Sequence, residues 1–316
     1  MLLRYRSLQK RRPHRRQYPC ARLNRKALLF ATCSVLTALF LPHITQRNTY
    51  YGYRMRKRRL QPTAELNNTG ATGADIIAFP FASRIIVSEV SRLIYCPIPK
   101  AANSNWKYLI RKFEGLPDYA DLTKAHNVNV SGLRYLSDYS ANEISQLIRD
   151  PSFFKFIFVR NPYSRIVSCY MDKFRNTDPV YVTTEYRLFL AQLFHWHYAR
   201  KVDIYRDPRP SFETFVDELL KQAPIAMNAH WMPQTTHCGI GIMPYDFVGR
   251  MENLAKDARF VLDRLGKFEE CFPSQQEIGF PPSGASKKME DELYTIDLRF
   301  KVRAIYDDDF QMLGYK

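Results

Sequence analysis

The chain has 316 residues, of which 46% are hydrophobic and 14% aromatic, so it can form a folded core and is not a disordered, collagen-like or low-complexity protein. Its formal net charge of +16 comes from the N-terminus, because 16 of the 47 Lys and Arg residues, and none of the 31 Asp and Glu residues, precede Gln61. The remainder carries no excess charge, which argues against a nucleic-acid-binding domain.

The N-terminal region predicts a membrane anchor. Residues 1–26 are basic, and residues 27–44 form an uncharged stretch that measures about 27 Å as a helix, close to the thickness of a thin bilayer. Because the larger block of positive charge precedes this stretch, we expect residues 1–26 in the cytoplasm and the rest of the chain across the membrane, as in a type II protein. A cleaved signal peptide and a buried soluble helix are the alternatives, but residues 41–44 show no small-residue cleavage pattern.

Residues 45–75 are polar, show no sustained apolar period and predict a flexible luminal stem. Two sequons, at Asn67 and Asn129, predict N-glycosylation if this part of the chain lies in the lumen.

Four cysteines lie in the body of the chain. Cys96 and Cys169 fall in apolar segments, where a buried thiol is the expected state. Cys238 and Cys271 fall in loop-like segments and could form one disulfide in an oxidising lumen. The pairing stays open, since four cysteines allow three complete connectivities.

Residues 76–316 alternate short apolar runs with helical patterns, which predicts one α/β domain with a central parallel sheet flanked by helices. The expected strands are 92–97, 155–159 and 245–249. The expected helices are 105–113, 163–174, 185–201, 211–222, 252–265 and 287–304.

The strand at 92–97 runs into a loop of small residues and then a helix. Backbone N–H groups of such a loop, together with the positive end of the helix dipole, can hold an anion. Lys100 adds a cation at the mouth of the loop and Ser104 a hydroxyl. The loop lacks the glycine and Lys-Ser/Thr pattern of nucleotide kinases, which argues against that activity. A proline-rich turn with an incidental lysine is the alternative interpretation.

A second element of this kind follows the strand at 155–159. Arg160 stands at the C-terminal end of the strand, where open α/β sheets place their ligands, and Pro162 can begin the next helix. An arginine combined with the hydroxyl of Ser168 suits a phosphate monoester. A surface ion pair is the alternative role for Arg160.

These two motifs resemble the nucleotide motifs of Golgi carbohydrate sulfotransferases, and most of all the chondroitin/dermatan 4-O-sulfotransferase branch. The motifs read Pro99-Lys100-x-x-x-Ser104-x-Trp106 and Arg160-x-Pro162-x-x-Arg165-x-x-Ser168-x-Tyr170-x-x-Lys173-Phe174. The resemblance continues through residues 125–126, 230–231, 245–252 and 306–315. Asn103 and Asn161 depart from the pattern expected of the family.

The resemblance implies a P-loop-like sulfotransferase fold in a Golgi membrane protein. It also implies 3′-phosphoadenosine 5′-phosphosulfate (PAPS) as donor, a glycan or proteoglycan as acceptor, and neither a metal nor a nucleic-acid partner. The loop from Pro99 to Asn105 would hold the 5′-phosphosulfate, and Arg160 with Ser168 the 3′-phosphate. The expected donor-binding residues are Pro99, Lys100, Ala101, Ala102, Asn103, Ser104, Asn105, Arg160, Arg165 and Ser168.

Sulfuryl transfer needs stabilisation of the leaving group and a base for the acceptor hydroxyl. Lys100 is placed to stabilise the charge that develops on the leaving oxygen. A histidine is the usual base near neutral pH, and His126, between the two motifs, is our first candidate. His230 is the second, although with Trp231 it could instead stack on a sugar.

Weaker candidates for the base are His195 and His197, which lie in an aromatic run and fit structural roles, and Glu252, which suits a helix cap. The expected acceptor position is the 4-O of GalNAc in chondroitin- or dermatan-type chains. A uronic acid or a terminal GalNAc is an alternative acceptor. A catalytically dead, membrane-tethered glycan-binding protein is the alternative function.

Overall fold

The computed structural model describes residues 72–77, 79–176, 184–194, 209–279 and 283–316. The expected tail and membrane span, and all of the expected stem before residue 72, lie outside these ranges. Within them, no helix combines the length and the apolar character that a membrane crossing requires.

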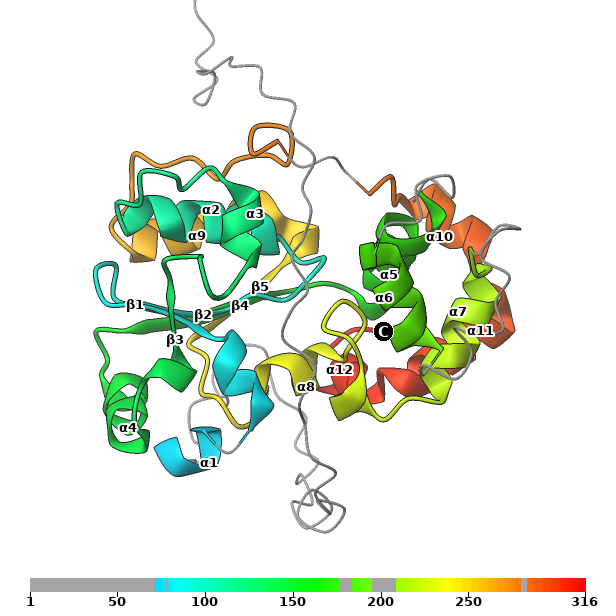
Figure 1. Cartoon of the computed structure of the whole chain (residues 1–316), viewed down its shortest axis with the longest axis horizontal. Coiled ribbons are helices and arrows are strands. Elements are labelled where there is room, and N and C mark those ends of the chain that lie inside the picture. Colours follow the sequence, from blue (N-terminus) through cyan, green and yellow to red (C-terminus); the bar gives the residue numbers. More distant parts are fainter. Residues whose placement is uncertain (1–71, 78, 177–183, 195–208, 280–282) are drawn as a thin grey trace, which may run out of the picture.

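A five-stranded sheet forms the centre of the described fold, in the order β3-β1-β2-β4-β5 (Figure 1). Its strands are β1 (Ile86–Ser88), β2 (Leu93–Cys96), β3 (Arg134–Tyr135), β4 (Phe154–Val159) and β5 (Phe247–Arg250). Strands β2, β4 and β5 are parallel, as expected, but β1 is antiparallel to both β2 and β3. The expectation of a parallel sheet therefore holds only for β2, β4 and β5. β1 and β2 are antiparallel because residues 89–92 are long enough for a hairpin and too short for a crossover.

Strand β4 is buried at all of its positions, as a strand between two parallel neighbours should be. Its one charged residue, Lys155, donates from Nζ to the Phe153 carbonyl (2.8 Å) and forms an ion pair with Asp246 (3.1 Å). These contacts allow a lysine to occupy a buried strand position.

Helices cover both faces of the sheet and form a lobe beside it (Figure 1). Helices α2 and α9 pack on one face and α4 on the other, while α5, α6, α7, α10 and α11 form the lobe. The helices are α1 (Gly73–Ile77), α2 (Asn103–Phe113), α3 (Leu122–His126), α4 (Ala141–Arg149), α5 (Pro162–Tyr170), α6 (Thr184–Leu193), α7 (Phe212–Leu220), α8 (Gln234–Cys238), α9 (Leu254–Arg264), α10 (Lys287–Leu293), α11 (Ile296–Ile305) and α12 (Asp307–Met312).

Residues 195–201 of the helix expected at 185–201 lie outside the described residues, and α6 ends at Leu193. Two other expected helices differ from the observed ones. The helix expected at 163–174 is α-helical only to Tyr170 and continues as a π-helical turn over Met171–Arg175. The helix expected at 287–304 is divided into α10 and α11, because Tyr294 takes an extended conformation and the Thr295 side chain caps α11.

A disulfide joins Cys96, at the end of β2, to Cys238, at the end of α8, with 5.9 Å between their Cα atoms. The expected pairing of Cys238 with Cys271 is therefore wrong, as is the expectation of a thiol at Cys96. The fold brings the end of β2 against α8, although 142 residues separate the two cysteines. Cys169 is a buried free thiol, as predicted.

Candidate functional site

Residues 97–102 form a loop that joins the end of β2 to the start of α2. Lys100 (φ 69°) and Ala102 (φ 59°) both take the left-handed conformation, which is uncommon outside glycine. Ala102 is the N-cap of α2, and no side chain from the described residues caps the helix there. The N–H groups of the first turn, which have no partners within a helix, are thus placed to bind an anion.

The second loop follows β4, the parallel neighbour of β2, so both loops lie at the same edge of the sheet. Asn161 caps α5 by accepting a hydrogen bond from the Tyr163 N–H (2.9 Å). Arg160 reaches across to the first loop and donates from Nη1 to the Lys100 carbonyl (3.4 Å). The two predicted anion-binding loops are therefore in direct contact.

A buried ion-pair cluster lies beside the first loop. Asp172 contacts Nζ of Lys100 (2.9 Å) and Nζ of Lys173 (3.2 Å). Burial acts to raise the pKa of Asp172, but the two lysines outweigh it and hold that pKa below the usual value. Burial lowers the pKa of Lys100, and Asp172 opposes this effect. The cluster gives the site an excess of positive charge, which suits an anionic ligand.

His126, at the end of α3, contacts the first turn of α2, directly after the first loop. Its Nε2 lies 2.9 Å from the Ser104 hydroxyl, which fixes the orientation of the ring. The pKa of His126 is lowered to about 3, chiefly by burial and then by Lys107, Lys173 and Lys100 in that order. The imidazole is therefore neutral at pH 7, which is the form that can accept a proton.

His230 lies close enough to the same lysines to interact with them. Burial, followed by Lys173 and Lys100, lowers its pKa well below the usual value. Its Nδ1 lies 2.8 Å from the Asn228 side-chain oxygen, and its ring packs edge-on against Phe189 at 5.3 Å. Both candidate bases are thus neutral imidazoles beside one cationic cluster.

Trp231 does not stack on a ligand, contrary to one of the roles considered for it. Its side chain is completely buried and packs against Phe174 and Phe215 in the helical lobe. Its Nε1 donates to the side-chain oxygen of Gln222 (3.1 Å). A sugar therefore cannot reach its face in this structure.

Arg165 is fully buried beneath the first loop. Its guanidinium donates to the carbonyls of Pro99 (3.1 Å), Met232 (2.8 Å) and Ala229 (3.1 Å). These contacts support the loop from below. Direct binding of the donor by Arg165 stays a prediction.

Other expected donor-binding residues have protein partners. The Ser168 hydroxyl lies 3.0 Å from the Ser283 hydroxyl, and Asn105 donates to the Pro273 carbonyl (2.8 Å). Ala101 is buried within the turn of the loop. Asn103 differs, because its buried side-chain oxygen finds no hydrogen-bond partner among the described residues.

Several residues at the site were not predicted from the sequence. Asp172, which pairs with Lys100, occupies an unassigned position within the second motif, and its position beside Lys173 is the only available signal. Gln234 bonds both backbone groups of Arg160 from 74 residues away, and nothing in the sequence indicates that contact. Glu252, in contrast, was a weaker candidate for the base, and the structure shows that it accepts from the Asn161 N–H (2.7 Å) and thus contacts the second loop.

Three residues considered from the sequence, His195, His197 and Asn67, lie outside the described residues. Asn129 is exposed, while Ser131 of its sequon is buried and bonded to the Val128 carbonyl (3.2 Å). Glycosylation at both sites stays a prediction.

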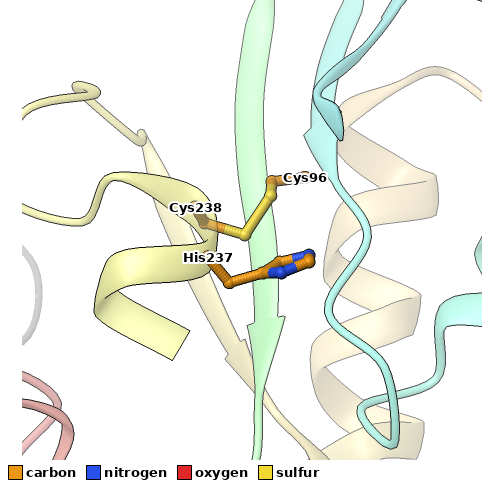
Figure 2. Close-up of side chains that lie close together, drawn as sticks. All are labelled: Cys96, His237 and Cys238. Carbon is orange, nitrogen blue, oxygen red and sulfur yellow. A yellow bond between two sulfur atoms is a disulfide. The ribbon is translucent and has the colours of Figure 1, made fainter. Parts of the chain in front are cut away.

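Cys96, His237 and Cys238 gather in a group that resembles a metal site, as Figure 2 shows. All three are buried, but the two sulfur atoms are bonded to each other. A disulfide offers no thiolate to a metal, so this group is a structural cross-link.

Residues 83–316 match the model of the sulfotransferase family. The chain is 31% identical over 234 residues to carbohydrate sulfotransferase 14 of Danio rerio, covering 73% of this chain and 62% of that protein. It is 28% identical over 298 residues to carbohydrate sulfotransferase 11 of Mus musculus, covering 89% and 81%. It is 32% identical over 185 residues to carbohydrate sulfotransferase 8 of Homo sapiens, covering 58% and 43%. No solved structure matches the chain.

Proposed function

This chain belongs to the sulfotransferase family, and from that premise we propose that it transfers a sulfuryl group from PAPS to a hydroxyl of a glycan. The observation that carries the proposal is the contact between the two loops through Arg160 and the Lys100 carbonyl. One ligand with phosphate groups at both ends can span these loops. PAPS has this form, with a 3′-phosphate and a 5′-phosphosulfate.

The residues present suit such a donor. The uncapped start of α2 offers backbone N–H groups to the 5′-phosphosulfate, and the Lys100 and Lys173 ammonium groups lie beside it. The buried side-chain oxygen of Asn103, unpartnered among the described residues, gains a partner if a ligand that can donate a hydrogen bond fills the loop. On the second loop, burial lowers the pKa of the Arg160 guanidinium, and a bound 3′-phosphate offsets that cost by neutralising its charge.

The catalytic roles follow from charge and protonation. PAPS supplies the sulfuryl group and leaves as adenosine 3′,5′-bisphosphate. Lys100 and the start of α2 stabilise the negative charge that grows on the leaving phosphate. Neutral His126 accepts the proton of the acceptor hydroxyl at Nε2, the atom that now contacts Ser104. His230 is the alternative base, since it is also neutral and near the same lysines.

We propose the 4-O position of GalNAc in chondroitin- or dermatan-type chains as the acceptor. Uronic acid and terminal GalNAc positions are the alternatives. We also propose a type II Golgi membrane protein, with residues 1–26 in the cytoplasm, 27–44 in the membrane and the body in the lumen. The Cys96–Cys238 disulfide supports this location, because disulfides persist in oxidising compartments.

The experiment that tests the function is sulfate transfer from labelled PAPS to a panel of desulfated chondroitin, dermatan and GalNAc-terminated glycans. We expect label in chondroitin or dermatan, and disaccharide analysis should place it on the 4-O of GalNAc. Label on a uronic acid or a terminal GalNAc would support the proposed reaction but show that the proposed acceptor position is wrong. Binding of glycan and donor without transfer would contradict the proposed enzyme.

A further inference from the structure

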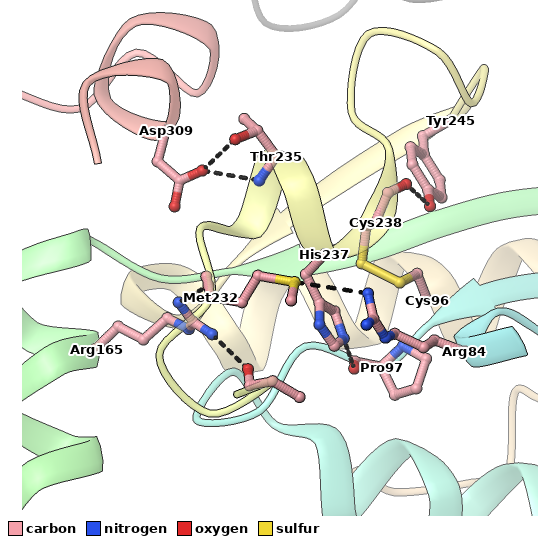
Figure 3. Close-up of a disulfide and its surroundings, with 11 residues drawn as sticks. Arg84, Cys96, Pro97, Arg165, Met232, Thr235, His237, Cys238, Tyr245 and Asp309 are labelled. Carbon is pink, nitrogen blue, oxygen red and sulfur yellow. Dashed lines mark hydrogen bonds between the residues drawn. A yellow bond between two sulfur atoms is a disulfide. The ribbon is translucent and has the colours of Figure 1, made fainter. Parts of the chain in front are cut away.

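Helix α8, Gln234–Cys238, contacts both nucleotide loops, one at each of its ends. It is a single short turn in the chain between Trp231 and β5, and none of its residues belongs to the motifs that predicted the site. Figure 3 shows one end of it against Asp309 and the other against the disulfide and Pro97. This arrangement gives α8 a role in the spacing of the two loops.

The N-terminal end of α8 holds Arg160. The Gln234 side chain accepts from the Arg160 N–H (2.9 Å) and donates to the Arg160 carbonyl (2.9 Å). Gln234 is completely buried, so no water competes for these bonds. A side-chain amide that pairs with both backbone groups of one residue fixes that residue's position.

Asp309 of α12 holds Gln234 and the start of α8 in turn. One of its carboxylate oxygens accepts from the Gln234 backbone (2.8 Å) and side chain (3.3 Å). The other accepts from the backbone and the hydroxyl of Thr235 (2.8 Å each). Asp309 and the nearby Arg165 are both fully buried, so the two charges offset each other. This carboxylate takes the place of the side-chain cap that Pro233 cannot supply.

The C-terminal end of α8 holds the first loop. Cys238 is bonded to Cys96, which directly precedes the loop, and His237 Nε2 lies 3.1 Å from the Pro97 carbonyl. A carbonyl only accepts, so Nε2 is the protonated nitrogen of His237. Burial lowers the pKa of His237 well below its usual value, and its buried Nδ1 finds no partner among the described residues. The ring is thus a neutral donor aimed at the start of the loop.

We propose that α8 is a positioning element that fixes the position of each nucleotide loop separately, one through each of its ends. Gln234 positions Arg160 for the 3′-phosphate, and His237 with the Cys96–Cys238 disulfide positions residues 97–102 for the 5′-phosphosulfate. This inference rests on the proposed function, since it assumes that the two loops bind the two ends of PAPS.

The test compares the affinities of adenosine 3′,5′-bisphosphate and adenosine 5′-monophosphate, measured by calorimetry on the whole chain. Their ratio reports recognition of the 3′-phosphate alone. We expect Gln234→Met, which keeps the length of the side chain and removes both bonds, to lower this ratio about tenfold. Affinity for the monophosphate should stay within about twofold of wild type, since the first loop is untouched.

Substitutions at the C-terminal end of α8 should change the affinities for the two nucleotides in a different way. His237→Met should weaken both nucleotides by a similar factor and leave their ratio unchanged, because both carry a 5′-phosphate. His237→Gln, whose amide N–H₂ can replace the Nε2 donor, should restore part of the affinity. Gln222→Met is the matched control, because Gln222 is a buried glutamine that bonds Trp231 and the Leu193 carbonyl, away from both loops. It should lower the melting temperature and leave both affinities unchanged.

The outcomes are distinguishable. If the wild-type protein binds neither nucleotide, the proposed function fails. If the wild-type protein binds them but Gln234→Met leaves the ratio unchanged, or weakens both nucleotides equally, α8 has only a structural role and the inference fails. Hydrogen exchange of residues 97–105 provides a second measurement without ligand. It should accelerate in His237→Met and not in Gln222→Met, and equal exchange in the two variants would also overturn the inference.

Discussion

The charged residues at the site act on one another's pKa values. Lys100 and Lys173 pair with one carboxylate, that of Asp172, and their positive charge depresses the pKa values of His126 and His230. The sequence indicated the lysine and the histidines, because each falls in or near a motif. Their mutual influence depends on the folded geometry, so no spacing rule predicts it. Two predictions follow from this coupling of charges.

The first concerns the protonation of His126. We expect its ring to stay neutral down to about pH 4 in the free protein, because burial and three lysines hold its pKa at about 3. Adenosine 3′,5′-bisphosphate should raise this pKa, since its phosphates offset the lysine charges. NMR titration of the ring signals measures both values, with His126→Gln for assignment. A free-protein pKa near the usual value would contradict this description of the site.

The second concerns Lys100. Lys100→Met should lower kcat about a hundredfold while changing nucleotide affinity much less, because the charge that Lys100 stabilises grows during transfer. Lys112→Met, on the helix that follows the loop, is the control, since Lys112 pairs with Glu270 (2.7 Å) and should leave kcat near wild type. Steady-state kinetics and calorimetry separate the two effects. An equal loss of kcat and affinity would show that Lys100 only binds the donor.

At the scale of elements, the parallel strands and the helices after them were predictable, and the two antiparallel strands β1 and β3 were not. β2 and β4 are short buried apolar runs, and α2 and α5 follow them with helical spacing, so local patterns identified them. β1 and β3 are too short to show a period of two residues. The Cys96–Cys238 bond escaped prediction because it depends on α8 packing against the end of β2, which is a tertiary contact.

Removing this disulfide should destabilise the connection between β2 and α8. We expect Cys96→Ala with Cys238→Ala to lower the free energy of unfolding by about 2–5 kcal/mol, because the bond closes a loop of 142 residues in the unfolded chain. Denaturant unfolding of the body measures the change. Cys169→Ala removes a buried free thiol and should cost less. A double variant as stable as Cys169→Ala would mean that the bond contributes little.

For the molecule as a whole, stability should fall in mild acid because the three described histidines are neutral in the native state. Burial lowers the pKa values of His126, His230 and His237, whereas the unfolded chain titrates at about 6.5. Below that pH the unfolded state binds more protons than the native state, so stability present above pH 6.5 is lost as the pH falls. The loss from each histidine accumulates as the pH falls below about 6.5.

Denaturant unfolding across this pH range tests the expectation. His237→Gln removes one titrating group, so its stability should depend on pH less steeply than that of the wild type. An unchanged slope would indicate that His237 is protonated in the native state.

The central claim is that two loops at one edge of the sheet form a single nucleotide site. A crystal structure of the protein with adenosine 3′,5′-bisphosphate tests it most directly. We predict the 5′-phosphate at the start of α2, beside Lys100, and the 3′-phosphate within hydrogen-bond distance of the Arg160 guanidinium. Density for the nucleotide at another place, or with its two phosphates exchanged between the loops, would contradict the account.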